Sequence, residues 1–298
     1  MGSSQVSSRV RISLIGVMLL VAAGCGADVQ DQPVDPDERE WIQLFNGTDL
    51  SGWSIKFTGQ ELGVNLRNTF RVEDGPLQVR YDEWESFDGE FGHIFYERPF
   101  SHYIVAAEYR FVGEQVTAGP NWAIRNNGLM LHSQSAESMG VDQDFPISIE
   151  VQLLGGLGEG ERSTANLCTP GTNVVYEGEL WTAHCRNSTS STYHGDEWVR
   201  VEVMVLGDSI MKHIVNGDTV MTYTQPQIGG GSVSGHDPAV KEDGKLLTSG
   251  YIALQAETAP IDFRRVEVLE LIGCTDPTAL NYKSYFVASD DESCTYAN

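Results

Sequence analysis

The sequence predicts an all-β protein, built as a β-sandwich or jelly roll. Several short segments alternate apolar and polar residues with a period of two, which is typical of half-buried strands. The 298 residues include 31 glycines, which suits a fold with many tight turns. Residues 41–272 also show little helical periodicity. One large β domain therefore accounts for most of the chain.

The amino-terminal segment predicts export. Arg9 and Arg11 precede an apolar run over 12–23, which has the length of a signal peptide and is short for a membrane span. The run ends in Ala22-Ala23-Gly24-Cys25, which looks like a bacterial lipobox. We expect residues 1–24 to be a lipoprotein signal peptide and Cys25 to carry the lipid that attaches the protein to the membrane. The alternative is an ordinary secretory signal with an incidental cysteine.

The full sequence is strongly acidic, and this excludes some classes of partner. The formal net charge is −23, from 19 basic and 42 acidic residues. Phosphate binding needs a basic surface, so nucleic acid is not an expected partner. Residues 25–40 are rich in Asp, Gln and Pro and predict a flexible acidic tether. Gly26, where Asp would favour inner-membrane retention, favours an outer-membrane anchor facing the periplasm or the cell surface.

Strand candidates fill the domain over 41–272. Segments 147–153 and 198–205 alternate apolar and polar residues. Asn216-Gly217-Asp218 predicts a hairpin turn between strands at 210–215 and 219–223. Further strands are expected at 103–111, 128–132, 250–256 and 266–271.

Alternation also assigns faces to these strands. Ile149 and Val151 share one face of segment 147–153, whereas Glu150 and Gln152 share the other. A carboxylate and an amide side by side suit a sugar, whose hydroxyls both donate and accept hydrogen bonds. His132 is expected on the same face of its strand as Met130. The alternative for Glu150 is a solvated strand residue, and for His132 a structural or exposed one.

The cysteines predict two disulfides. Four cysteines remain once Cys25 is set aside, and an even number in an exported protein indicates disulfides. Three pairings exist, of which Cys168–Cys185 and Cys274–Cys294 join near neighbours. A zinc site is the alternative, but no short-spaced cysteine pair supports it.

Several segments together resemble the 3-keto-disaccharide hydrolase family. These are WIQLFNGTDLSGW at 41–53, RNNGLMLH at 125–132, SIEVQ at 148–152, GYIALQAE at 250–257 and PIDFRRV at 260–266. They occur in the family's order and span residues 41–272. The resemblance implies a concanavalin A-like jelly-roll sandwich of two antiparallel sheets. It also implies a glycoside hydrolase that acts on 3-keto-disaccharides or related glycosides, and the lipobox-like segment predicts that this hydrolase is exported and lipid-anchored.

The implied reaction defines the residues to look for. A ketone at C3 acidifies the proton on C2, and the enolate formed by its removal can expel the oxygen on C1. This chemistry needs a base, an acid and a group that stabilises the enolate. Glu150 is the first candidate for acid or base and His132 the second. Candidates for binding the substrate are Arg125, Gln152, Gln255 and Glu257.

Other functions stay open at this stage. Glu150 and Glu257 could instead act as the two carboxylates of a conventional glycosidase. A divalent cation could stabilise the enolate, although no spacing in the sequence predicts its ligands. The alternative from another class is a non-catalytic carbohydrate-binding lipoprotein, since both functions occur on one fold.

The tail over 273–298 is expected to be a small separate module. Cys274-Thr275-Asp276-Pro277 and the closing Cys294 resemble a short repeat at the ends of secreted bacterial proteins. Oxygen ligands in the tail could hold Ca²⁺; the candidates are Asp276, Asn281, Asp290, Asp291 and Glu292. The alternative is a disulfide-closed acidic turn without a metal.

Overall fold

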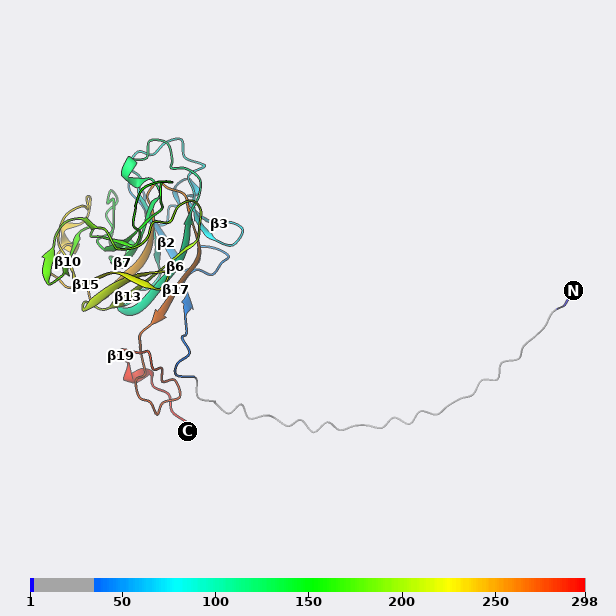
Figure 1. The fold of residues 1–298 in the computed structure, drawn as a ribbon, viewed down its shortest axis with the longest axis vertical. Helices are drawn as coiled ribbons and strands as arrows, with labels where there is room; N and C mark the ends of the chain where they lie inside the picture. The colour runs from blue at the N-terminus through cyan, green and yellow to red at the C-terminus, as the bar shows by residue number, and fades with distance from the viewer. Residues whose placement is uncertain (3–34, 298) are drawn as a thin grey trace. The chain divides into compact units, whose positions relative to one another are not determined.

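Two large antiparallel sheets make up the protein and confirm the predicted all-β jelly-roll sandwich (Figure 1). The structure is a computed structural model that describes residues 1–2 and 35–297. Residues 35–297 belong to one compact unit. Cys25, the predicted signal peptide and most of the predicted tether lie outside the described residues. Among the described residues, no helix is long and apolar enough to cross a membrane.

The larger sheet has ten strands, ordered β11-β10-β15-β14-β13-β6-β17-β4-β3, with β1 paired to β17. Its strands are β1 (Ile42–Gln43), β3 (Phe70–Val72), β4 (Leu77–Val79), β6 (His102–Phe111), β10 (Thr172–Tyr176), β11 (Glu179–Trp181), β13 (Val199–Leu206), β14 (Ile210–Val215), β15 (Asp218–Ile228) and β17 (Ile261–Glu270).

The smaller sheet has seven strands, ordered β12-β9-β8-β7-β16-β5-β2. Its strands are β2 (Trp53–Phe57), β5 (Gly92–Tyr96), β7 (Asn126–Ser133), β8 (Ile149–Leu154), β9 (Asn166–Cys168), β12 (Cys185–Arg186) and β16 (Tyr251–Ala256). The described helices are short 3-10 turns: η1 (Leu66–Asn68), η2 (Asn121–Ala123), η3 (Ala136–Ser138), η4 (Pro238–Val240) and η5 (Asp291–Ser293).

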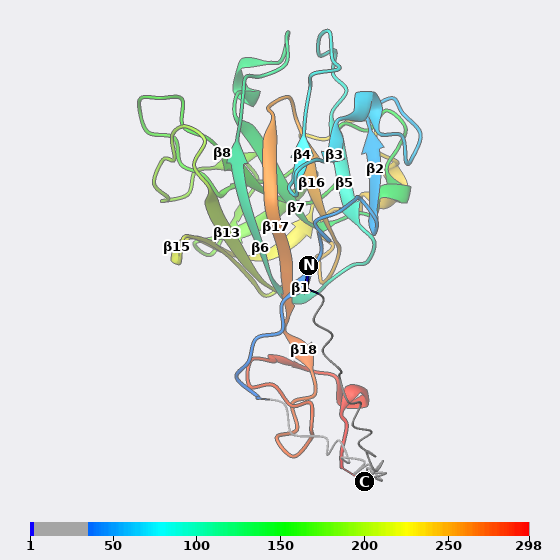
Figure 2. The same cartoon turned by 90° about the vertical axis from the view of Figure 1, so that its right-hand side faces the viewer.

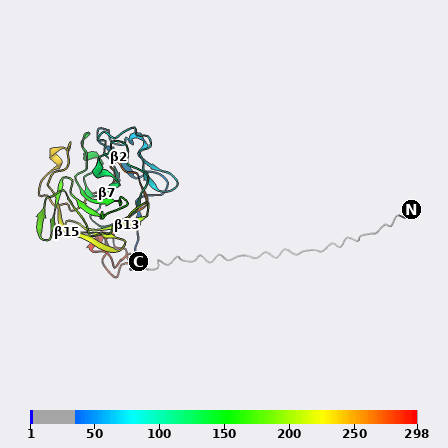
Figure 3. The ribbon, with the colours of Figure 1, turned by 45° about the horizontal axis from the view of Figure 1, so that its top comes forward.

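The hydrophobic core lies between the two sheets, and Figure 3 shows β7 in one layer with β13 and β15 in the next. Ile149 and Val151 of β8 enter this core together with Val201 of β13. The alternation in β8 therefore has the predicted sense, because Glu150 and Gln152 lie on the face turned away from the core.

The strands found from the sequence are present within a few residues of their predicted bounds. The predicted hairpin joins β14 to β15, and its turn residues Asn216 and Gly217 have φ of 49° and 96°. Positive φ at both positions is what a two-residue hairpin turn requires. The strands missed from the sequence include β2 and β5, which form one edge of the smaller sheet.

Both predicted disulfides are confirmed. Cys168 and Cys185 are directly opposite each other on β9 and β12, with 4.1 Å between their Cα atoms. Cys274 and Cys294 close the tail over a separation of 20 residues. The first disulfide fastens the edge strand of the smaller sheet, and the second closes the carboxy-terminal module.

The tail follows β17 through β18 (Ile272–Gly273), which pairs with β19 (Ala288–Ser289), as Figure 2 shows. Lys283 is almost fully buried in it. The Nζ atom of Lys283 lies 2.8 Å from Glu40 Oε1 and donates to the carbonyl oxygens of Asp35 and Glu38. The last residues of the predicted tether are thus fastened to the tail, which corrects the expectation that the tether is flexible up to residue 40.

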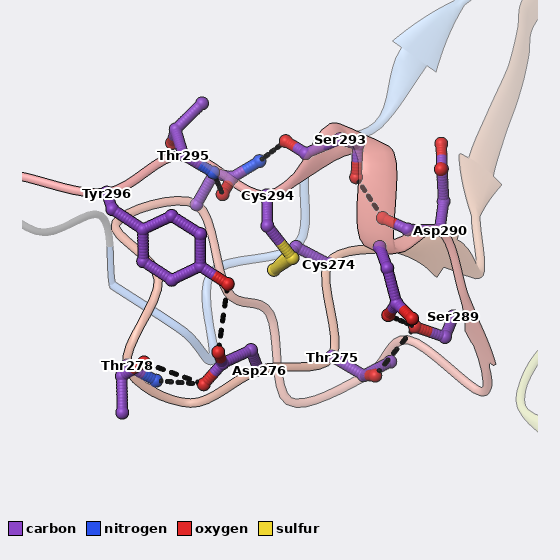
Figure 4. Close-up of a disulfide and its surroundings, with 12 residues drawn as sticks. Cys274, Thr275, Asp276, Thr278, Ser289, Asp290, Ser293, Cys294, Thr295 and Tyr296 are labelled. Atoms are coloured by element: carbon purple, nitrogen blue, oxygen red, sulfur yellow. Dashed lines mark hydrogen bonds between the residues drawn. A yellow bond between two sulfur atoms is a disulfide. The ribbon is translucent and has the colours of Figure 1, made fainter.

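The predicted calcium ligands do not gather around one point. Asp276 accepts hydrogen bonds from Thr278 and from the Tyr296 hydroxyl (Figure 4). Asn281 bridges to the backbone of Ser293 and Thr295. No three carboxylates of the described tail, including Asp290, Asp291 and Glu292, have oxygens within 4.8 Å of one another. The side chains as they lie brace the disulfide-closed loop, and calcium binding by the tail stays a prediction.

Candidate active site

A cavity of about 660 Å³ opens on the smaller sheet, on the face turned away from the core. Its floor comes from β7, β8 and β9, and its walls come from the loops around 144–145, 170 and 232–234. The Cys168–Cys185 disulfide forms part of one wall. The polar residues that line it include Asn126, Glu150, Gln152 and Glu257, three of which were predicted site residues.

Two carboxylates face this cavity from strands on either side of β7. Glu150 lies on β8, and Glu257 follows β16 directly. Gly128 of β7 lies between them, and a Cβ atom there would lie 2.8 Å from the Cγ and Oε1 atoms of Glu150. The absence of a side chain at Gly128 therefore leaves the space in which the Glu150 carboxyl group lies.

Burial changes the acid–base chemistry of both carboxyl groups. Glu150 and Glu257 are 5% and 3% exposed. Burial raises the pKa of Glu150 to about 8. The pKa of Glu257 is also well above its ordinary value, first because of burial and then because of the charge of Glu150, with Arg162 opposing the shift. The two groups therefore titrate as a pair that retains at least one proton near neutral pH.

Several buried polar atoms at this face have no hydrogen-bond partner among the described residues. They are both ring nitrogens of His93, Asn126 Oδ1, Gln255 Oε1 and Glu257 Oε2. An unpaired buried polar atom costs free energy, so a cluster of them is typical of a surface that binds a ligand. Most are acceptors, which suits a ligand with many hydroxyl donors.

Two predicted binding residues, Gln255 and Gln152, also lie on this face of the smaller sheet. Gln255 is fully buried in the floor, and its Nε2 lies 3.4 Å from Glu257 Oε1. The side-chain oxygen of Gln152 accepts a hydrogen bond from Asn166 Nδ2 at 3.1 Å. This bond orients the Gln152 amide and leaves its own N–H groups available to the cavity.

His93 is a site residue that the sequence analysis missed. It lies on β5, opposite Gln255 of β16 and Lys56 of β2. Burial, with a smaller contribution from Lys56, lowers the pKa of His93 to about 3, so the ring is neutral and carries one N–H donor. The signal was a polar residue in the Gly92–Tyr96 strand, which was usable only once that strand had been recognised.

Aromatic side chains form another wall of the cavity. Trp122 is 55% exposed and lines the cavity together with Phe145. Both rings lie near Phe91, with centroids 6.1 and 4.7 Å from it. An exposed ring beside polar groups can stack on the apolar face of a sugar or on an aglycone.

His132 does not lie at the cavity, and the prediction of its face is wrong. A β-bulge at this point makes Leu131 and His132 together oppose one residue of β16, and His132 has φ of 46°. An extra residue reverses the alternation of side chains along a strand. The His132 ring therefore turns toward Tyr103, and its Nε2 pairs with the carbonyl oxygen of Gly207.

Arg125 also lies away from the carboxylates. Its guanidinium group donates to the carbonyl oxygen of Gly195, lies 3.5 Å from Asp196 and packs over Phe111. It lines a different, very small cavity. The prediction that Arg125 contacts a substrate in the main cavity is therefore wrong for the side chain as it lies.

Metal binding at this site depends on how close its possible ligand atoms lie to one another. His93, Glu150 and Glu257 carry suitable ligand atoms, but these atoms do not all lie within 4.8 Å of one another. In the described chain, one group of three possible metal ligands has its ligand atoms within 4.8 Å of one another, and it consists of Cys168, His184 and Cys185. Both cysteines of this group are oxidised in the disulfide. As they lie, the His93, Glu150 and Glu257 side chains do not fit a single metal ion that all three would bind.

A comparison with protein families finds a match over most of the chain. A family model described as the 3-keto-alpha-glucoside-1,2-lyase-like domain matches residues 40–269. No curated protein sequence matches significantly.

Several solved structures are similar to this chain over most of its length. A Parabacteroides distasonis protein provisionally assigned as a glycosyl hydrolase has 15% identity and a TM-score of 0.46, covering 78% of this chain and 100% of its own. LamAcat of Zobellia galactanivorans has 10% identity and a TM-score of 0.46, with coverages of 78% and 98%. The carbohydrate-binding module CBM66 of Bacillus subtilis has 13% identity and a TM-score of 0.36, with coverages of 77% and 95%.

Proposed function

Because the chain belongs to the 3-keto-alpha-glucoside-1,2-lyase-like domain family, we propose that it cleaves 3-keto-disaccharides or related 3-keto-glycosides through an enolate. The observation that carries this proposal is the buried pair Glu150 and Glu257, which face one cavity and share raised proton affinity. Titratable pairs of this kind are characteristic of acid–base sites. A purely carbohydrate-binding surface has no need of them.

In the proposed first step, Glu150 acts as the base. Its ionised carboxylate takes the proton from C2 of the keto sugar, and the electron pair of that C–H bond forms the enolate. Glu150 is assigned this role because the charge of Glu150 raises the pKa of Glu257, which keeps Glu257 protonated after the pair has lost one proton. One carboxylate and one carboxylic acid are then present together.

In the second step, the enolate collapses and the C1–O bond breaks. Glu257 gives its proton to the departing oxygen, which leaves as an alcohol. The keto sugar that remains has a double bond between C1 and C2. Addition of water across that double bond completes hydrolysis. The Gln152 amide lines the cavity and supplies N–H donors that can stabilise the enolate oxygen.

The decisive experiment compares 3-keto-disaccharides with their unoxidised parents in deuterated water. We expect the purified protein to release a sugar from the keto forms alone and to incorporate deuterium at C2. Glu150→Gln should abolish both, because an amide cannot accept the C2 proton. The matched control is Glu242→Gln, whose carboxylate is 75% exposed and forms an ion pair with Lys245 outside the cavity.

Other outcomes would refute the proposal. Cleavage of the unoxidised parents with no deuterium at C2 would indicate a two-carboxylate glycosidase. Binding of the sugars with no cleavage would indicate a carbohydrate-binding protein.

The two disulfides are typical of an extracellular or periplasmic protein. We further propose that the mature chain begins at a lipidated Cys25 and is anchored in the outer membrane. This proposal rests on the lipobox-like sequence alone. Mass spectrometry of the mature amino terminus tests it, and an unmodified Cys25 would contradict it.

A further inference from the structure

A second cavity, of about 800 Å³, lies beside the first and is not used by the proposed chemistry. Its lining is almost entirely polar and contains six hydroxyl side chains, which are Ser163, Ser188, Thr189, Ser190, Ser191 and Thr192. We call it the hydroxyl groove. Six of its lining residues come from the segment 187–192, which follows the Cys168–Cys185 disulfide.

The hydroxyl groove adjoins the catalytic cavity along β8. Glu150 and Gln152 line the first cavity, and Leu154 of the same strand lines the groove. These alternate residues share one face, with steps of about 7 Å. The hydrogen bond from Asn166 to Gln152 joins the two walls, because Asn166 lines the groove and Gln152 lines the cavity.

The hydroxyl protons of the groove are largely committed to the protein. Ser188 and Ser190 both donate to the carbonyl oxygen of Thr164, at 2.6 and 2.9 Å. Thr189 donates to the carbonyl oxygen of Val220, and Ser163 donates to Asn166 Oδ1. Each hydroxyl oxygen still has lone pairs that can accept. The groove therefore presents acceptors to a ligand.

The charged residues that line the groove also affect which ligands it can bind. Arg162 lines the groove, but its guanidinium donates to three backbone carbonyl oxygens. Three of its five N–H donors are therefore used within the protein, and Glu161 adds a negative charge to the lining. A surface of lone pairs and a carboxylate disfavours an anion such as a phosphate. It suits a neutral ligand with several hydroxyl donors.

We propose that the hydroxyl groove binds the second glycosyl unit of the substrate, the one joined to the keto sugar held at Glu150 and Glu257. This inference rests on the proposed function and names its substrate class as a disaccharide or longer saccharide. The groove holds the sugar that leaves, and the cavity holds the sugar that reacts. Binding in the groove then adds to affinity and orients the bond to be broken.

Asn187 and Ser191 allow a test that leaves the internal hydrogen bonds in place. Both are exposed and line the groove, and their side chains make no hydrogen bond to the described residues. Asn187→Trp and Ser191→Trp should each fill part of the groove. The matched control is Thr219→Trp, at an exposed position outside both cavities.

The assay compares a 3-keto-disaccharide with the 3-keto methyl glycoside of the same sugar. Each groove variant should lower kcat/KM for the disaccharide about tenfold or more, as expected for the loss of one or two hydrogen bonds. Neither groove variant should change kcat/KM for the methyl glycoside by more than about twofold, because this substrate has no second sugar ring that could contact the groove. Equal loss on both substrates, or no loss on the disaccharide, would overturn the inference.

Failure of the proposed function is recognised separately. If the unaltered protein cleaves neither substrate, the chemistry is wrong, and the groove is tested by calorimetric binding of the disaccharide and the methyl glycoside to the unaltered protein and to both groove variants. Weaker binding of the disaccharide alone in both groove variants would still support the subsite. Unchanged disaccharide binding would refute it.

Discussion

Glu150→Gln should make the protein more stable than the unaltered chain at alkaline pH. Glu150 is 5% exposed, and burial raises its pKa to about 8 from an ordinary value of 4.5. The difference between these values, at about 1.4 kcal/mol for each tenfold change in proton affinity, corresponds to about 5 kcal/mol. This is the free energy of folding that is lost when Glu150 ionises, if the same group has its ordinary pKa in the unfolded chain.

The sign follows from proton binding. The folded chain holds the Glu150 proton more tightly than the unfolded chain, so this stability is fully present below about pH 4.5. It is lost as the pH rises through about 8. Glutamine has the same shape and no charge, so the variant avoids the loss. The difference between variant and unaltered chain should therefore grow between pH 4.5 and pH 9 by up to about 5 kcal/mol.

Urea denaturation at several pH values between 4 and 9 measures this difference, provided that the dependence on urea is unchanged by the substitution. Glu242→Gln, at a carboxylate that is 75% exposed, should show no comparable pH trend. A constant difference between Glu150→Gln and the unaltered chain across this range would refute the reasoning. It would mean that the Glu150 carboxylate remains solvated in the folded state.

Two further substitutions test the site and the tail. Gly128→Ala should lower kcat/KM about 10- to 100-fold by displacing the Glu150 carboxyl group, because a misplacement of about 1 Å has effects of that size. The control in the same kinetic assay is Gly231→Ala, where an added Cβ meets nothing within 4 Å. Equal activities of the two variants would contradict the prediction. Lys283→Met should destabilise the tail by about 2 kcal/mol, because two backbone carbonyl oxygens lose a charged donor. Hydrogen exchange at residues 35–40 should then become faster, and unchanged exchange would show that other contacts hold the segment.

Much of the fold could be predicted because its strands carry their own pattern. Val201 and Val203 alternate with polar residues in β13, and Asn216-Gly217 supplies the positive φ values of a hairpin. Such features depend only on neighbouring residues. Glu150 was placed on the correct face for the same reason, since β8 continues without a bulge between Ile149 and Gln152.

The errors arose where a local pattern was interrupted or where distant segments meet. The bulge in β7 reversed the face of His132, and Arg125 turned toward Gly195 and Asp196 from a distant loop. His93 was missed because its importance depends on Gln255, which is 162 positions later and directly opposite it. Contacts of this kind leave no periodic signal in one sequence.

The sequence by itself determined the sandwich, the presence of disulfides and a polar strand face with Glu150, because these follow from alternation, composition and cysteine number. Which of the three cysteine pairings forms was decided by the tertiary structure. The tertiary structure decided that Glu150 and Glu257 form a buried pair across Gly128, and that His93 lies in the same floor. The physical reason is that proton affinity and unpaired hydrogen-bonding groups depend on burial. Burial is set by the whole packed sheet and its loops, and the strands supply only the side chains.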